Sequence, residues 1–63
     1  MSKYTITYKG FIFEGDEENG WNSRETNDWA YAISIYDNYA DEENEMYITD
    51  NEYGVTFSNG VWI

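Results

Sequence analysis

The chain contains no cysteine, no histidine and no proline, and each absence removes a class of structure or chemistry. Without cysteine and histidine there are no disulfides, thiolate nucleophiles, imidazole bases or zinc sites of the usual ligand sets. A chain of 63 residues buries only about 60% of its unfolded surface, so packing alone must stabilise this one. Without proline, the edges of a β-sheet depend on charged side chains to oppose pairing with other strands.

Positively charged residues are also scarce: three Lys and Arg stand against thirteen Asp and Glu, for a net charge of −10. The three cations all precede residue 25, whereas residues 25–63 hold nine acids and no cation. This charge disfavours direct binding to nucleic acid or anionic membranes and steers the molecule toward basic partners. No apolar stretch approaches the roughly 20 residues that span a bilayer, and no secretory hydrophobic region follows Met1. We therefore expect an intracellular, cytoplasmic protein.

Aromatic residues are plentiful, at 21% of the chain, which argues against disorder. Aromatic side chains dominate small cores, and we expect a core of Tyr4, Ile6, Phe11, Phe13, Trp29, Ile33 and Phe57. Thirteen aromatic residues exceed what one side of a small sheet can bury. Some of the following should therefore be exposed: Trp21, Tyr36, Tyr39, Tyr47, Tyr53 and Trp62.

The first strands are predicted from alternation and turn chemistry. Tyrosine and isoleucine alternate with threonine from Tyr4 to Tyr8, which is typical of a half-buried strand. Lys9-Gly10 supplies a two-residue turn and Phe11–Phe13 the returning strand, which together predict an N-terminal hairpin. Residues 15–28 are rich in Gly, Asn, Ser and acid and predict a long loop, whose Trp21 folds back onto the sheet edge.

Residues 29–36, "WAYAISIY", fit two structures. Period two places the larger side chains on one face of a strand. Helical spacing instead aligns Trp29 and Tyr36 in one stripe, with Thr26 or Asn27 as the N-cap. The aromatic and β-branched content favours the strand.

The C-terminal half predicts short strands joined by tight turns, and Asn59-Gly60 is the strongest hairpin signal in the chain. The chain is thus predicted to be a single small acidic domain, residues 1–63, of the all-β class: an antiparallel sheet of hairpins. The alternative is an α+β fold, ββαββ, with a helix around residues 26–40. The other expected elements are a hairpin loop or helical turn over 37–45, strands over 46–49, 55–57 and 61–63, and turns over 50–54 and 58–60.

The abundance of acid raises the possibilities of catalysis and of calcium binding. Two carboxylates about 5 to 9.5 Å apart can hydrolyse glycosides, but a domain this small has little room for a deep cleft. An EF-hand loop needs Gly at position 6, where a loop starting at Asp41 has Met46. A loop starting at Asp16 has Gly20 one position too early. We therefore expect no enzymatic activity, no cofactor and no dedicated metal site.

The acids form two runs, "DEEN" at residues 16–19 and "DEENE" at residues 41–45. Acidic runs usually form a solvated face, but ordinary soluble surfaces intersperse both signs, which this chain does not. Same-face residues of a strand repeat at about 6.6–6.8 Å, similar to successive phosphates of DNA, so carboxylates can meet the cations of a nucleic-acid-binding groove. In a strict meander the 16–28 and 37–45 loops lie at opposite ends of the sheet. The residues expected to bind a partner are Asp16, Glu17, Glu18, Asp37, Tyr39, Asp41, Glu42, Glu43, Glu45, Asp50, Glu52 and Tyr53.

A very small, acidic, Asn- and Tyr-rich chain without cysteine resembles the phage-encoded inhibitors of bacterial defence that mimic DNA. These include anti-CRISPR, anti-restriction and uracil-DNA glycosylase inhibitor proteins. The resemblance covers the whole chain as a profile, and the stretches nearest to it are "DEENG", "DEENE" and "TDNEYG". It implies a non-enzymatic inhibitor that occupies the PAM-reading or duplex-binding groove of a nuclease such as a CRISPR effector. The expected site of action is the host cytoplasm.

A second hypothesis is a structural or regulatory interaction module, such as a subunit of a phage particle. This module would bind through exposed Trp21, Trp62 and Tyr53, and its acids would serve only solubility. Salt separates the two hypotheses, because electrostatic binding weakens as salt rises whereas an apolar interface holds or strengthens. In either case the chain is expected to be a monomer or a homodimer.

Overall fold

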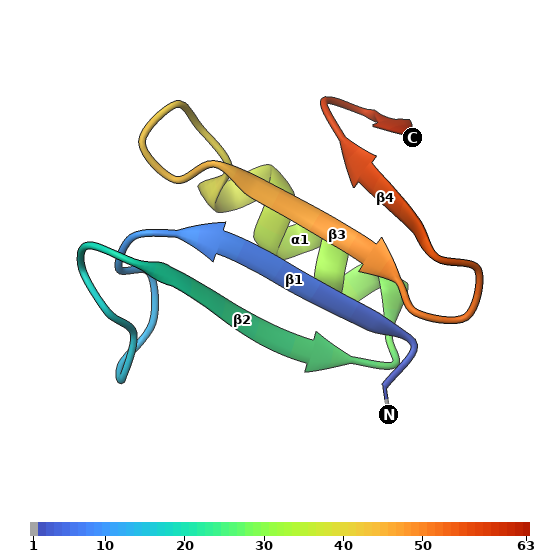
Figure 1. The fold of residues 1–63 in the computed structure, drawn as a ribbon, viewed down its shortest axis with the longest axis horizontal. Coiled ribbons are helices and arrows are strands. Elements are labelled where there is room, and N and C mark those ends of the chain that lie inside the picture. Colours follow the sequence, from blue (N-terminus) through green and yellow to red (C-terminus); the bar gives the residue numbers. More distant parts are fainter. Residues whose placement is uncertain (1) are drawn as a thin grey trace.

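The computed structural model describes residues 2–63 as a five-stranded antiparallel sheet covered on one face by a helix (Figure 1). The strands are ordered β2-β1-β3-β4-β5 across the sheet. The prediction of a small antiparallel sheet is confirmed, and the single helix is the one foreseen by the α+β alternative. In chain order the elements are β1 (Tyr4–Lys9), β2 (Trp21–Thr26), α1 (Trp29–Tyr39), β3 (Met46–Asp50), β4 (Val55–Ser58) and β5 (Val61–Trp62).

The N-terminal hairpin joins β1 to β2, so the strand predicted over Phe11–Phe13 and the loop predicted around β2 are wrong. Every residue of β1 has an antiparallel partner in β2. The backbone N–H groups of Ile12 and Phe13 donate instead to the carboxylate of Asp16, at 3.3 and 2.8 Å. A side chain a few residues ahead therefore replaces strand pairing and bends the chain into a loop.

The strand predicted over residues 29–36 is also wrong, because these residues belong to α1. Asp28 is the N-cap, and its Oδ1 accepts a hydrogen bond from Ala30 N at 2.9 Å. Helical spacing brings both Ala32 and Ile35 into the core, where they are 0% and 4% exposed. In a strand these two residues would point to opposite faces, and only one could be buried. Packing on the sheet therefore overrides local β-propensity.

The helix determines where the second half of the chain begins. β2 and β3 both pair antiparallel with β1, one on each side, so they run parallel to each other and need a crossover connection. α1 makes this crossover on one face of the sheet (Figure 1). As a result, β3 starts at the end of the sheet where β1 stops and β2 starts.

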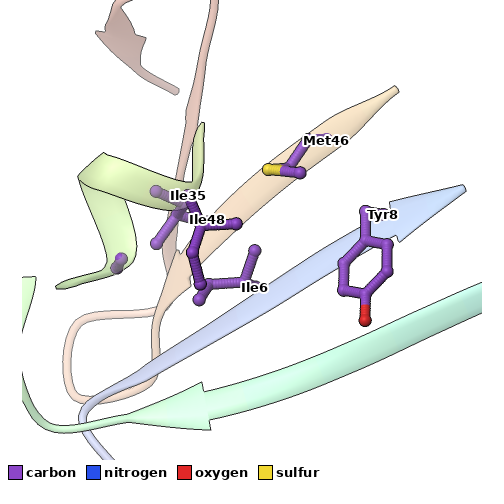
Figure 2. Packing of buried hydrophobic residues seen from close by; sticks show 6 residues of the cluster. Ile6, Tyr8, Ile35, Met46 and Ile48 are labelled. Carbon is purple, nitrogen blue, oxygen red and sulfur yellow. The ribbon is translucent and has the colours of Figure 1, made fainter. Parts of the chain in front are cut away.

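The core lies between α1 and the inner side of β1 and β3, as Figure 2 shows for Ile6, Tyr8, Ile35, Met46 and Ile48. Of the predicted core residues, Ile6 is fully buried. Phe11 is 54% exposed because it lies in the loop after β1 rather than in a strand, so its assignment to the core is wrong. The other predicted residues are partly buried and pack against the cluster: Tyr4, Phe13, Trp29, Ile33 and Phe57.

The C-terminal half follows its predicted turns. Asn59 and Gly60 have φ values of 53° and 83°, as the two central positions of a type I′ hairpin turn require. They join β4 to β5, a strand of only two residues. Trp62 of β5 packs on Trp29 of α1 with 5.3 Å between ring centroids, which fastens the C-terminal hairpin to the helix.

Candidate functional site

The two acidic runs lie in loops that meet at one end of the sheet. We call this the acidic end and define it as residues 10–20 and 40–45. The opposite placement that a strict meander predicts does not occur, because α1 returns the chain to the end where β1 stops. Two hydrogen bonds join the second loop to the end of β1, from which the first loop starts: Lys9 N to Glu45 O at 3.0 Å and Asn44 Nδ2 to Lys9 O at 2.8 Å. A third, Gly10 N to Gly20 O at 3.0 Å, closes the first loop.

Gly10 is a point of close approach between the two loops. Its φ of 89° lies in the left-handed region that favours glycine. A Cβ at this position would stand 2.9 Å from Asn44 Nδ2, closer than real contacts of a Cβ. A side chain at position 10 would displace the Asn44 amide, which donates to Lys9 O, so glycine at this position allows the second loop to keep its contact with β1.

The first loop is held in shape by Asn22 at the start of β2. Its side chain accepts a hydrogen bond from Glu17 N and donates to the carbonyl oxygens of Gly10 and Glu17, each at 3.0 Å. Glu17 and its neighbour Glu18 are both exposed. Their carboxylates are therefore presented on a backbone that is already ordered.

Asp16 differs from its neighbours because its carboxylate is used inside the protein. Its Oδ2 accepts a hydrogen bond from the hydroxyl of buried Tyr8 at 2.7 Å, besides those from Phe13 N and Ile12 N. Burial raises the pKa of Asp16, but the hydrogen bonds from Phe13, Tyr8 and Ile12 together lower it by more. Burial and the hydrogen bond to Asp16 raise the pKa of Tyr8 to about 12. Asp16 thus anchors the loop to the core.

The second loop is organised by Asp41. Its Oδ1 accepts hydrogen bonds from Glu43 N at 2.8 Å and from Asn44 N at 2.7 Å. Such a side-chain-capped turn is typical of aspartate. Glu42 and Glu43 stand on this turn, and both are exposed. The second loop therefore also presents carboxylates on an ordered backbone.

Three of the predicted partner-binding residues lie at the opposite end of the sheet. Asp50 ends β3, and Glu52 and Tyr53 belong to the connection from β3 to β4, where Asp50 Oδ1 accepts from Glu52 N and Tyr53 N at 2.9 and 3.1 Å. One flat partner surface cannot contact both ends in the same way. The other predicted residues lie at the acidic end or in the last turns of α1 that lead into it: Asp16, Glu17, Glu18, Asp37, Tyr39, Asp41, Glu42, Glu43 and Glu45.

A groove of about 670 Å³ opens beside the second acidic loop. It exists because β4 pairs only with Ile48–Asp50, so Met46 and Tyr47 at the start of β3 have no partner in β4. The β4–β5 turn leans toward the helix, where Asn59 N donates to the Tyr36 hydroxyl at 2.8 Å. Carboxylates and aromatic rings share the groove lining: Asp37, Asp41, Glu42, Glu45, Tyr36, Tyr47 and Phe57.

The groove also carries backbone groups. Glu45 O accepts from Lys9 N, so the backbone of Glu45 and of alternate residues after it faces β1. The N–H and C=O of Met46 therefore face the β4 side, into the groove. On the groove wall, the Tyr47 hydroxyl donates to Glu45 Oε2 at 2.5 Å, and this bond raises the pKa of Tyr47. The groove thus combines negative charge, ring faces and a strand edge.

Sequence reasoning found the acids but missed the groove. Tyr36 and Tyr47 are half-buried in its walls, whereas four of the aromatic residues proposed for exposure are exposed: Trp21, Tyr39, Tyr53 and Trp62. Asn59 is recognisable from the sequence as a turn residue, but its contact with Tyr36 spans 23 positions and leaves no local signal.

Within residues 2–63 no group of three acids is placed to hold a metal ion, and no helix is long and apolar enough to cross a bilayer. No protein-family model, no curated protein and no solved structure matches the chain.

Proposed function

We propose that this protein is a non-enzymatic inhibitor that inserts its acidic end into the basic groove of a nucleic-acid-binding protein. A CRISPR effector or another defence nuclease of the bacterial cytoplasm is the target class that fits. The observation that carries the proposal is the meeting of the two acidic loops, since Glu45 and Asn44 of the second loop are hydrogen-bonded to Lys9, directly before the first loop. Eight of the thirteen acids belong to these loops: Glu14, Asp16, Glu17, Glu18, Asp41, Glu42, Glu43 and Glu45.

Binding of this kind depends on charge and shape, without a chemical step. Carboxylates take the places of phosphates among the lysines and arginines of the target, and the negative field speeds the encounter. Asp16, Asn22 and Asp41 hold the loops in place before binding, so little conformational entropy is lost when the partner docks.

The groove beside α1 gives the acidic end a place for one cationic side chain of the target. A planar guanidinium can form paired hydrogen bonds with a carboxylate and stack on an aromatic ring. Asp37 and Glu42 supply carboxylates, and Tyr36 and Tyr47 supply rings. An arginine suits this lining better than a lysine, because an ammonium group cannot stack in the same way.

The competing hypothesis, an aromatic interaction module, has weaker support because its residues do not share a surface. Trp21 begins β2 at one edge of the sheet, and Trp62 lies on β5 at the other edge. Tyr53 lies in the turn at the end opposite to Trp21. Aromatic anchors contribute most when they cluster near the centre of an interface.

The proposal is tested by capturing partners from a bacterial lysate at low and high salt, with duplex DNA as competitor. The triple variant Glu42→Lys/Glu43→Lys/Glu45→Lys should weaken binding about 100-fold, because each exposed charge contributes up to about 1 kcal/mol. Glu43→Lys and Glu52→Lys are matched single changes at the two ends of the sheet, and only the first should weaken binding. Unchanged affinity of the triple variant, or capture that neither salt nor DNA reduces, would refute the proposal.

A further inference from the structure

The face of the sheet opposite α1 is turned toward the viewer in Figure 1, and no other element of residues 2–63 covers it. We call it the open face. Strand residues on it alternate with residues that face the helix, so the register of the sheet identifies them. Most are small and uncharged: Thr5, Thr7, Ser23, Thr49, Thr56 and Ser58.

Two aromatic side chains rise from this face. Trp21 and Tyr47 stack with ring centroids 6.2 Å apart and an interplanar angle of 29°, although β1 lies between their strands. Trp21 is still 51% exposed, and Val61 at the far edge is 56% exposed. A stacked aromatic pair with one open side is the kind of anchor found in protein interfaces.

Charge is sparse on the open face of a molecule whose net charge is −10. Among the charged residues of the strands, Arg24 and Asp50 lie on the side of the sheet that faces α1, and Lys9 and Glu25 lie on the open face. Glu45, just before β3, also reaches this face where it borders the acidic end, and its carboxylate accepts the hydrogen bond from Tyr47. The remaining acids lie in loops, in turns or on the helix. Two copies of this chain would therefore repel each other least if they met through the open face.

We propose that the open face is the interface of a homodimer, in which two copies pack face to face with their strands antiparallel. This arrangement puts the two acidic ends at opposite ends of the dimer, whereas a parallel one would bring them together. With the twofold axis level with Thr7, Lys9 of one copy lies over Thr5 of the second copy. Glu25 is the register partner of Thr5 on β2, so it lies beside this position. Twofold symmetry forms this Lys9–Glu25 pair twice. Within one copy the two residues are four positions apart along the ladder, about 13 Å, too far to pair.

The dimensions of the molecule suit a weak dimer. Its two longer extents are 30 and 23 Å, so the face measures at most about 690 Å² per copy (30 × 23), or about 1,380 Å² for two copies. Specific interfaces bury about 1,200–2,000 Å² in total. Serine and threonine allow two sheets to approach to about 10 Å, as in β-sandwiches. These extents include the loops beyond the strands, so the buried area lies below that upper bound. A largely polar interface of such a size is expected to be weak, with a Kd of about 1–100 µM.

Sedimentation equilibrium of the full chain over a range of concentrations tests the proposal. Thr7→Glu changes the residue level with the twofold axis and should raise the dimer Kd at least tenfold. The matched control Ala30→Glu adds the same charge to an exposed position of α1 and should leave the Kd unchanged. A chain that stays monomeric at every concentration, or a dimer that Thr7→Glu does not weaken, overturns the proposal.

A charge exchange tests the orientation without relying on one disruptive change. Lys9→Glu and Glu25→Lys alone should each weaken the dimer about tenfold, and the double variant should restore it. The two residues cannot meet within one copy, and Glu25→Lys changes the net charge of each copy from −10 to −8 (−10 + 2), which by itself would favour association. Weakening by Glu25→Lys together with restoration in the double variant can therefore only come from contact between copies. A dimer that the double variant does not restore is not the antiparallel arrangement proposed. The dimer and the proposed function share Tyr47, which lines the groove and also lies on the open face. The two remain distinguishable, since added salt should strengthen the dimer and weaken binding to a basic partner.

Discussion

The contact between Asp16 and Tyr8 allows a quantitative test of how the acidic end is anchored. Asp16→Ala removes the acceptor of three hydrogen bonds, from Tyr8 OH, Phe13 N and Ile12 N. Tyr8 is 0% exposed, so its unpaired hydroxyl costs about 1–3 kcal/mol, whereas the partly buried loop N–H groups can turn to water. We expect the free energy of unfolding to fall by about 2–4 kcal/mol. That is a large part of the roughly 3–9 kcal/mol typical of a domain this size.

Urea unfolding followed by tryptophan fluorescence measures this change, and Tyr8→Phe, alone and combined with Asp16→Ala, completes a double-mutant cycle. The coupling energy should be about 1–2 kcal/mol, because the two side chains share one hydrogen bond. Glu18→Ala removes an exposed acid from the same loop and should change stability by no more than about 0.5 kcal/mol. If Asp16→Ala has no larger effect than Glu18→Ala, or if the cycle is additive, the anchoring role is wrong.

Three further predictions concern pH and the joint between the loops. Folding raises the pKa of Tyr8 from 10.0 to about 12, so the contribution of its hydroxyl to stability is complete below pH 10 and disappears as pH rises toward 12. In alkaline titration the free energy of unfolding should fall by at most about 2.7 kcal/mol from this group, and Tyr8→Phe should abolish that fall. Folding lowers the pKa of Asp16 below 3.8, so its contribution is present above that pH and lost below it, and Asp16→Asn should flatten the acid limb of a stability–pH curve. Gly10→Ala should lower the free energy of unfolding, measured in urea, by about 1–3 kcal/mol, and Gly54→Ala should lower it by less. Both glycines have positive φ, but only a side chain at position 10 would contact Asn44, so equal effects would contradict the close approach.

The C-terminal half was predictable because its signals are local. Asn59-Gly60 predicts a type I′ turn directly, since this turn needs positive φ at both central positions and few other residue pairs tolerate it. The N-terminal half was not, because Phe11–Phe13 have the composition of a strand whereas residues 21–26 have that of a loop. In the structure residues 11–20 form the loop, which is anchored by the hydrogen bond of Asp16 to Tyr8, eight positions away on β1. Local alternation carries no information about such a contact.

The helix and the site show the same limit. Residues 29–36 favour a strand by composition, and only the need to bury both Ala32 and Ile35 against the sheet selects a helix. The acidic character of the site could be read directly from the sequence. Its assembly at one end could not, because that depends on the crossover by α1. The groove depends further on where β4 leaves β3, next to the long-range contact of Asn59 with Tyr36.

The crossover by α1 has a consequence for any partner of the acidic end. Its two halves come from loops that β2 and α1 separate in the chain, so the complete set of carboxylates exists only after folding. A short linear peptide copied from residues 41–45 would lack Lys9, to which Asn44 and Glu45 are hydrogen-bonded. A partner that grips both loops would therefore act as a ligand of the native state, and at 100 times its Kd it would add about 2.7 kcal/mol of stability. In a cell, proteases would then degrade the bound molecule more slowly than the free one.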